Sequence, residues 1–250
     1  MELNSAQWAI AISGALLVGL GKGGLPGAGN ITIWLYALVF GSKQSVGLLL
    51  PVLICADIVA VLVYRKHAEW VYIKKLFPLA AIGVVVGFFI FDRMSSAQMN
   101  RVIGVVLLGM TVLHFVRKGL VSRRGASTRD PIPHTWWFVS ATGLVAGVAT
   151  MVANAAGPVA GFYFMSVRLP KIAFIGTSAW FFLCINLFKM PFQIAADNVS
   201  LVSLKMSLTL GVFAALGAVI APHLVKLIPQ KLFESLVWAV IVFAALKMIV

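Results

Sequence analysis

Long apolar segments alternate with short polar stretches along the whole of this chain. Crossing the hydrocarbon core of a membrane as an α-helix takes about 20 apolar residues, and several of the segments reach that length. The pattern therefore predicts an all-α integral membrane protein. The segments cover residues 8–20, 28–40, 45–64, 76–91 and 99–116 in the first half, and residues 135–149, 156–167, 172–192, 203–221 and 232–250 in the second.

The first two apolar segments are joined by a stretch that cannot stay helical. Residues 19–30 read Gly-Leu-Gly-Lys-Gly-Gly-Leu-Pro-Gly-Ala-Gly-Asn. In a helix interior, glycine costs about 1 kcal/mol and proline about 3 kcal/mol relative to alanine. At membrane depth, unwound backbone is tolerated only where protein or a water-filled cavity surrounds it. We therefore expect a broken helix that lines a cavity at the membrane midplane, with Lys22 in the break.

The two halves of the chain resemble each other. An offset of 128 residues pairs Gly19 with Gly147, and an offset of 129 pairs Asp57 with Asn186. The order of short and long apolar segments is also the same in both halves. We therefore predict a repeated architecture with three parts: a first transmembrane repeat over residues 1–118, a basic cytoplasmic linker over 119–134 and a second transmembrane repeat over 135–250.

Basic residues indicate which ends of the segments face the cytoplasm. The loops at residues 65–75 and 117–130 are rich in lysine and arginine, and two apolar segments separate them, so both lie on one side. The positive-inside rule makes that side cytoplasmic. We therefore predict a multi-pass protein of the cell (inner) membrane.

The stretch from residue 8 to residue 40 is too long for one straight crossing. Its 33 residues exceed the 20 or so that suffice, and two half-helices that meet at the glycines fit better. The same reasoning for residues 135–167 leaves Lys171 cytoplasmic and Asp197 outside. The repeats then have inverted topology, each a broken or re-entrant helix pair followed by three transmembrane helices. If the half-helices nearly span the membrane, the same arrangement is described equally well as ten short helices.

Composition supports a membrane protein and excludes other classes. The chain is 61% hydrophobic and 11% charged, with a net charge of +13, whereas soluble chains carry about 25% charged residues. Because topology accounts for the basic excess, we expect no nucleic-acid partner. The cysteines, Cys55 and Cys184, lie in apolar segments and form no metal or disulfide pattern. With no P-loop, hydrolase or zinc motif, we expect neither an enzyme nor a cofactor.

The two breaks have the chemistry of an anion site. Helix N-termini present unpaired N–H groups and the positive end of the helix dipole, and glycine lets an anion approach the backbone. Asn30 and Asn154 are suited either to capping a half-helix or to donating an amide to an oxyanion. The expected substrate-binding residues are Gly21, Lys22, Gly23, Gly24, Pro26, Gly27, Gly29 and Asn30 in the first half, and Asn154, Ala155, Ala156, Gly157 and Pro158 in the second.

Three further polar residues lie inside apolar segments and are candidates for coupling or gating. Asp57 needs a basic partner or a backbone donor at membrane depth, and Lys22 is the nearest candidate; the acid is then either a structural tie or a proton carrier. Asn186, its counterpart, does not titrate. Lys189 follows Asn186 by three residues and faces either the cavity or the outer interface.

Several motifs are similar to those of a known family. Residues 21–29, residues 48–57 and 64–70, and residues 176–182 and 186–191 resemble motifs of the sulfite exporter TauE/SafE family, also called the 4-toluene sulfonate uptake permease family. The resemblance covers nearly the whole chain and implies an inner-membrane carrier of two repeats that moves, usually outward, sulfite, sulfoacetate or related organosulfonates. Ala155 and Ala156 stand where many members have glycines.

The leading hypothesis is a secondary transporter of small sulfur-containing oxyanions. The resemblance to the family implies that it is an exporter. An anion channel and a carrier of another small organic anion remain alternatives, as does a membrane-embedded enzyme acting on a sulfur compound. The expected partners are that anion and the lipid bilayer, and the sequence leaves a homodimer open.

Overall fold

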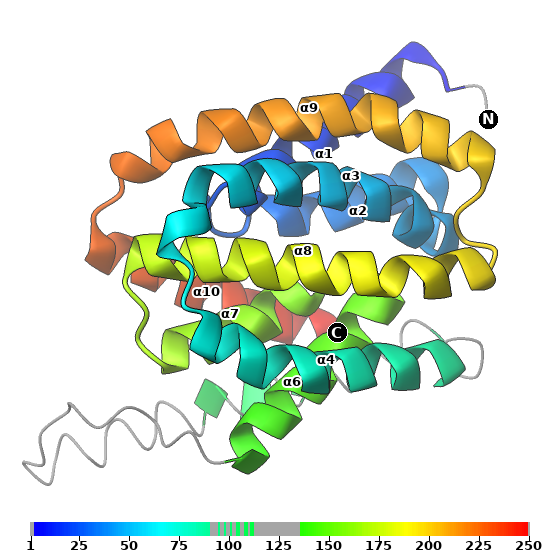
Figure 1. Cartoon of the computed structure of the whole chain (residues 1–250). Coiled ribbons are helices and arrows are strands. Elements are labelled where there is room, and N and C mark those ends of the chain that lie inside the picture. The colour runs from blue at the N-terminus through cyan, green and yellow to red at the C-terminus, as the bar shows by residue number, and fades with distance from the viewer. Residues whose placement is uncertain are drawn as a thin grey trace, which may run out of the picture. The chain divides into compact units, whose positions relative to one another are not determined.

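The protein is helical throughout the part that can be described. The computed structural model describes residues 3–90, individual positions between 95 and 112, and residues 136–249, and contains no strand among them. The predicted linker and most of the segment 99–116 lie outside these residues. The helices (Figure 1) are α1 (Ser5–Lys22), α2 (Ala28–Phe40), α3 (Ser42–Tyr64), the 3₁₀-helix η1 (Arg65–His67), α4 (Trp70–Ile90), α6 (Trp136–Ala153), α7 (Ala156–Ser166), α8 (Lys171–Ala195), α9 (Leu201–Lys226) and α10 (Gln230–Ile249).

Five of the described helices are long and apolar enough to cross a membrane. They cover Gln44–His67, Trp70–Ile90, Trp136–Ala153, Lys171–Ala195 and Ser203–Lys226. This confirms the prediction of an all-α integral membrane protein. The span Trp136–Ala153 is longer than the short half-helix expected there. Its 18 residues extend for about 27 Å at 1.5 Å per residue, close to the roughly 30 Å of a hydrocarbon core.

The chain divides into two compact units, and each draws on both halves of the sequence. Unit 1 contains residues 1–73 and 171–233, and unit 2 contains residues 74–170 and 234–250. Unit 1 therefore holds α1, α2, α3, α8 and α9, whereas unit 2 holds most of α4, α6, α7 and most of α10.

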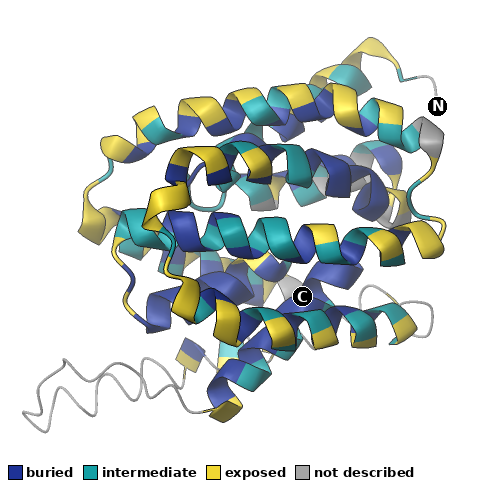
Figure 2. Ribbon diagram, viewed as in Figure 1, coloured by how far each residue is buried: buried dark blue, intermediate teal, exposed yellow. Residues whose placement is uncertain are grey.

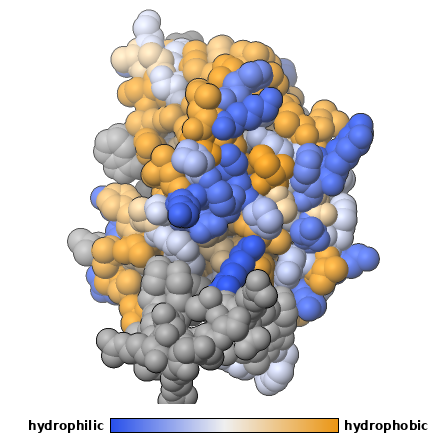
Figure 3. Space-filling view, turned by 90° about the vertical axis from the view of Figure 1, so that its left-hand side faces the viewer, coloured by the Kyte–Doolittle hydropathy of each residue, from blue (hydrophilic) through white to orange (hydrophobic). Residues whose placement is uncertain are grey.

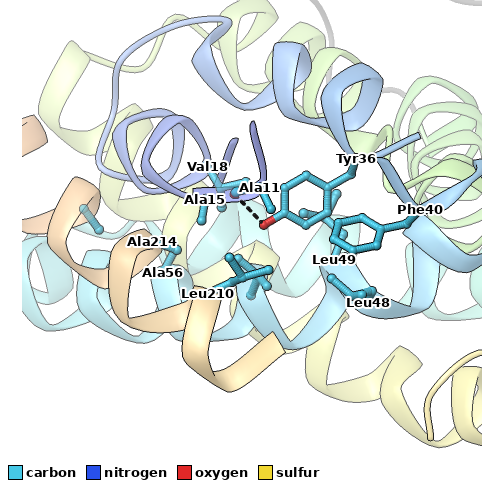
Figure 4. Close-up of a cluster of buried hydrophobic side chains, with 12 residues drawn as sticks. Ala11, Ala15, Val18, Tyr36, Phe40, Leu48, Leu49, Ala56, Leu210 and Ala214 are labelled. Carbon is cyan, nitrogen blue, oxygen red and sulfur yellow. Dashed lines mark hydrogen bonds between the residues drawn. The ribbon is translucent and has the colours of Figure 1, made fainter. Parts of the chain in front are cut away.

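In unit 1, α2 turns back along α1 and packs against it. The Thr32 hydroxyl donates to the carbonyl of Gly14 at 2.9 Å, and the Tyr36 hydroxyl donates to the carbonyl of Ala11 at 3.2 Å. Positions that ascend on α2 thus meet positions that descend on α1, so the helices are antiparallel. Tyr36 lies in a buried apolar cluster with side chains of α1, α3 and α9 (Figure 4), which fixes this hairpin in unit 1.

Glycines bring α1 and α9 into backbone contact. A Cβ on Gly19 would overlap the carbonyl oxygen of Ala214 and lie 2.8 Å from the Cα of Gly217. Small residues permit this close approach, which is a common basis of helix packing in membranes, where van der Waals contact replaces the hydrophobic effect.

Unit 2 repeats this contact between a different pair of helices. A Cβ on Gly147 of α6 would overlap the carbonyl oxygen of Ala80 and lie 2.8 Å from the Cα of Gly83, both on α4. Gly147 is the sequence counterpart of Gly19. A single offset of 134 residues carries Ala80 to Ala214 and Gly83 to Gly217, so equivalent positions make equivalent contacts within each unit.

Helices α3 and α8 of unit 1 also run antiparallel. The carbonyl of Asn198, just beyond α8, lies against Gly47 near the start of α3, while Gly176 near the start of α8 lies against the carbonyl of Tyr64 at the end of α3. Between these ends, Ala179 packs with Val61. These two helices are the third in their respective halves of the sequence.

Burial follows the pattern expected in lipid. In unit 2, α7 is buried at every position except Gly157 (Figure 2), as expected for a short helix that is apolar all round. Large apolar side chains on the longer helices are instead exposed, including Phe89 at 68% on α4 and Val212 at 60% on α9. Such exposed apolar faces suit contact with lipid chains.

We predict that Gly19→Ala lowers the midpoint of thermal unfolding of the protein purified in detergent. The added methyl group must push α1 away from α9, at a cost of about 1–3 kcal/mol typical of overpacking. Gly29→Ala is the matched control, because a Cβ there meets nothing within 4 Å. An equal effect of the two substitutions would contradict the close packing at Gly19.

Candidate functional site

The first predicted break is present between α1 and α2. Helix α1 ends at Lys22, and the N–H of Gly23 donates to the carbonyls of Gly19 and Gly21. Gly24 has φ 112° and Gly27 has φ 84°, values that residues with a side chain rarely adopt. The glycines are therefore required for the chain to reverse direction before α2 begins at Ala28.

This turn lies near one end of the helices in unit 1. The Tyr64 hydroxyl, at the end of α3, donates to the carbonyl of Gly23 at 3.0 Å. A Cβ on Gly24 would meet Ile175, in the second turn of α8. The expected position was halfway along the helices, at the membrane midplane. The difference arises because α1 has 18 residues and extends for about 27 Å.

The side chain of Lys22 reaches from the turn to a buried acid. Its Nζ lies 2.8 Å from Oδ1 of Asp57 on α3, and the side chains of Lys22 and Asp57 are 15% and 0% exposed. The same Nζ lies 4.1 Å from the centroid of the Phe182 ring on α8, a cation–π distance. The predicted pairing of Lys22 with Asp57 is confirmed, and it ties the end of α1 to α3.

A third helix completes the cluster. The Asn186 amide on α8 donates to Oδ2 of Asp57 at 2.7 Å, so each carboxylate oxygen has a partner of its own. Asp57 and Asn186 are counterparts in the two halves of the sequence, and they meet directly where α3 and α8 cross.

Lys189 lies one turn beyond Asn186 and is buried. Its side chain is 0% exposed, and it interacts electrostatically with both Lys22 and Asp57. The sequence left open whether Lys189 faces the interior or the outer interface, and its burial favours the interior. Lys22, Asp57, Asn186 and Lys189 are called the charged cluster below.

Sequence reasoning missed two buried polar residues of α8. Gln193 is fully buried, and its side-chain oxygen accepts from the Asn198 amide at 2.9 Å. Thr177 is also fully buried and accepts from the backbone N–H of Glu69 at 2.9 Å. Gln193 continues the face of α8 that carries Asn186 and Lys189 at spacings of three and four residues, and that periodicity was the available signal.

The second break, in unit 2, is built differently. Helix α6 ends at Ala153 and α7 begins at Ala156, and Asn154 has φ 53°, a left-handed conformation that asparagine tolerates better than most residues. The N-cap of α7 is Ala155, without a side-chain hydrogen bond. Asn154 lies one position before this N-cap. Pro158 is in the first turn of α7, as expected.

Asn30 is the third residue of α2 and so lies inside the helix rather than at its cap position. Its side chain is outside the described residues. Among the residues that the structure describes, no group of three or more His, Cys, Asp or Glu side chains is placed to hold a metal ion.

One end of unit 1 is basic. The Lys171 ammonium donates to the carbonyls of Val225 and Ile228 at 2.9 and 2.6 Å, which joins the start of α8 to the end of α9. Lys66 and Lys226 are exposed near these helix ends. Figure 3 looks onto the side of the molecule where α9 ends and α8 begins, and hydrophilic residues gather there among apolar ones.

The model of one family, described as sulfite exporter TauE/SafE, matches residues 11–248 of the 250-residue chain. The chain belongs to the sulfite exporter TauE/SafE family. No curated protein and no solved structure matches it. Membership makes the protein a membrane transporter of sulfite or related anions, in agreement with its apolar helices.

We predict that Lys22 and Asp57 are energetically coupled. Lys22→Met leaves a buried carboxylate without its ion-pair partner and should cost about 3–5 kcal/mol, less the part that solvent already screens. Adding Asp57→Asn removes that unpaired charge and should restore part of the loss. A double-mutant cycle from unfolding midpoints in detergent measures the coupling, and additive effects of the two substitutions would contradict it.

Proposed function

We propose that this TauE/SafE family member is a secondary carrier that exports a small sulfur-containing oxyanion, sulfite or an organosulfonate, and that it holds the anion at Lys22 and Lys189. The observation that carries this proposal is the charged cluster, in which Lys22 pairs with the buried Asp57 and a second lysine, Lys189, is fully buried one turn beyond Asn186. Ionised groups inside membrane helices are costly and usually mark a substrate or ion pathway.

The chemistry of the cluster suits a sulfur oxyanion. A lysine ammonium has three donors and the Asn186 amide has two, enough to hold the oxygens of a sulfite or sulfonate group. Lys22 retains 15% exposure beside the fully buried Asp57, so its ammonium is the member of the pair that an entering anion reaches first.

We propose that the glycine turn takes part in binding alongside Lys22. The residues concerned are Gly21, Gly23, Gly24, Pro26, Gly27, Gly29 and Asn30. The N–H groups of Gly23, Gly24 and Leu25 donate to carbonyls of α1, so the expected donors are the N–H groups at the N-terminus of α2, which the glycines allow an anion to approach. We propose the same role for Asn154 and residues 155–158, because the N-terminus of α7 presents the positive end of the helix dipole to an anion.

We propose that the two halves are inverted repeats. Two observations support this proposal. Equivalent glycine contacts occur in α1–α9 and in α6–α4, and the counterpart helices α3 and α8 run antiparallel with Asp57 against Asn186. In carriers built this way, one repeat or bundle rocks against another around a fixed site. The predicted repeat boundaries, 1–118 and 135–250, belong to this proposal.

The basic end of unit 1 supports a topology for the inner membrane. The positive-inside rule would place Lys66, Lys171 and Lys226 in the cytoplasm, with Asp197 outside. In this orientation the glycine turn opens toward the cytoplasm, where an exporter takes up its substrate.

The proposed binding role of Lys189 is tested by transport in proteoliposomes. Lys189→Met should lower the uptake of radiolabelled sulfite at least about tenfold, because one of two charges that attract the anion is lost. Unlabelled sulfite trapped inside should accelerate uptake by the unmodified protein, which a carrier does and a channel does not. Lys205→Met, at an exposed lysine of α9, is the matched control. Equal uptake by the two variants would overturn the role of Lys189.

The topology makes a separate prediction. In a background with Cys55→Ala and Cys184→Ala, a cysteine replacing exposed Ala195 at the end of α8 should react with a membrane-impermeant maleimide on intact cells. A cysteine replacing exposed Lys226 at the end of α9 should react only after the cells are opened. The reverse pattern would contradict a cytoplasmic basic end.

A further inference from the structure

We infer that the charged cluster selects anions by their charge, accepting singly charged oxyanions and rejecting doubly charged ones, and that Asp57 sets this selection. The inference rests on the proposed binding role of the cluster. It adds a specificity that the family assignment does not contain.

The carboxylate of Asp57 is fixed in the site. Oδ1 pairs with Lys22 at 2.8 Å, Oδ2 accepts from Asn186 at 2.7 Å, and the side chain is fully buried. Its negative charge is therefore part of the surroundings that any anion meets at Lys22.

The interior charges of unit 1 leave an excess of one positive charge. Three charged side chains of α1, α3, α8 and α9 belong to the charged cluster: Lys22 extends into it from the last residue of α1, and Asp57 and Lys189 are buried within α3 and α8. Helix α2 carries no charged residue in its sequence. The remaining described lysine and histidine side chains of these helices, Lys171, Lys205, His223 and Lys226, lie in the terminal turns or are exposed. With Lys22 and Lys189 protonated and Asp57 ionised, the charges of the cluster sum to +1.

The net charge of the cluster determines which anions it can neutralise. A singly charged sulfonate or hydrogensulfite brings the cluster to zero. A sulfate dianion, or the dianionic form of sulfite, leaves a net negative charge among apolar helices, where an unpaired charge is strongly disfavoured. The second negative charge also lies near Asp57, and juxtaposed like charges at a binding site cost several kcal/mol. Sulfite, which near neutral pH is a mixture of both forms, is therefore bound as hydrogensulfite.

The test compares methanesulfonate with sulfate, which share a tetrahedral sulfur and carry one and two negative charges at neutral pH. Titration calorimetry of the purified protein in detergent should give methanesulfonate at least about a tenfold lower Kd. Asp57→Asn raises the cluster to +2 and should shift the ratio of the two Kd values at least tenfold toward sulfate. Asn186→Asp lowers it to zero and should weaken the binding of both anions.

Glu69→Gln is the control, because it removes an exposed carboxylate at the start of α4 and should leave the ratio unchanged. Sulfate bound as tightly as methanesulfonate by the unmodified protein would overturn the inference, whether or not Asp57→Asn folds. An unchanged ratio in folded Asp57→Asn would also overturn it while leaving the proposed function intact. If neither anion nor sulfite binds and no flux is measured, the proposed function itself fails, and the inference with it.

Discussion

The ion pair between Lys22 and Asp57 constrains the arrangement of unit 1. A carboxylate that is fully buried among apolar helices is tolerated only with a partner, and Lys22 supplies one at 2.8 Å. The pair forms only if the end of α1 lies beside α3, and the bond from Asn186 to the same carboxylate adds α8. One acid thus specifies the relative position of three helices that are distant in the sequence.

Glycine contacts make that position attainable. Lys22 is the last residue of α1, so its reach depends on where α1 ends and how closely α1 packs on its neighbours. Gly19, one turn earlier, lets α1 touch the backbone of α9, and the left-handed Gly24 and Gly27 turn the chain back as α2. The glycines of this stretch therefore end α1 and also fix the position of the Lys22 ammonium, which explains why glycine and lysine occur together here.

Much of this arrangement was predictable from local sequence. The break at residues 23–27 follows from helix propensity, and the partner of Asp57 follows from the cost of a lone acid at membrane depth. The depth of the turn was not predictable, because it depends on how far α1 stays helical through its glycines. The burial of Lys189 was also left open, since an amphipathic lysine near a helix end satisfies the same pattern when it reaches the interface.

The division into units was harder to anticipate than the helices themselves. Sequence repeats suggest that each half folds on its own, yet α1 packs on α9 and α6 packs on α4. The sequence around Gly19 or Gly147 does not indicate which distant helix supplies the small residues that face it. In both pairs a helix of one half of the sequence packs on a helix of the other half, and small residues form the contact each time.

The departure from symmetry at the centre of α3 and α8 has a physical reason. Two aspartates facing each other there would place two carboxylates at hydrogen-bond distance, and one would have to be neutral. Replacing one by Asn186 converts repulsion into a donated hydrogen bond. Asn186 also leaves Asp57 as the one acid of a cluster that holds two lysines, so the residue that stabilises the contact between α3 and α8 also sets the charge balance of the cluster. Under the proposed function, the stability of this contact and the affinity for an anion have a common origin in a single asymmetric pair.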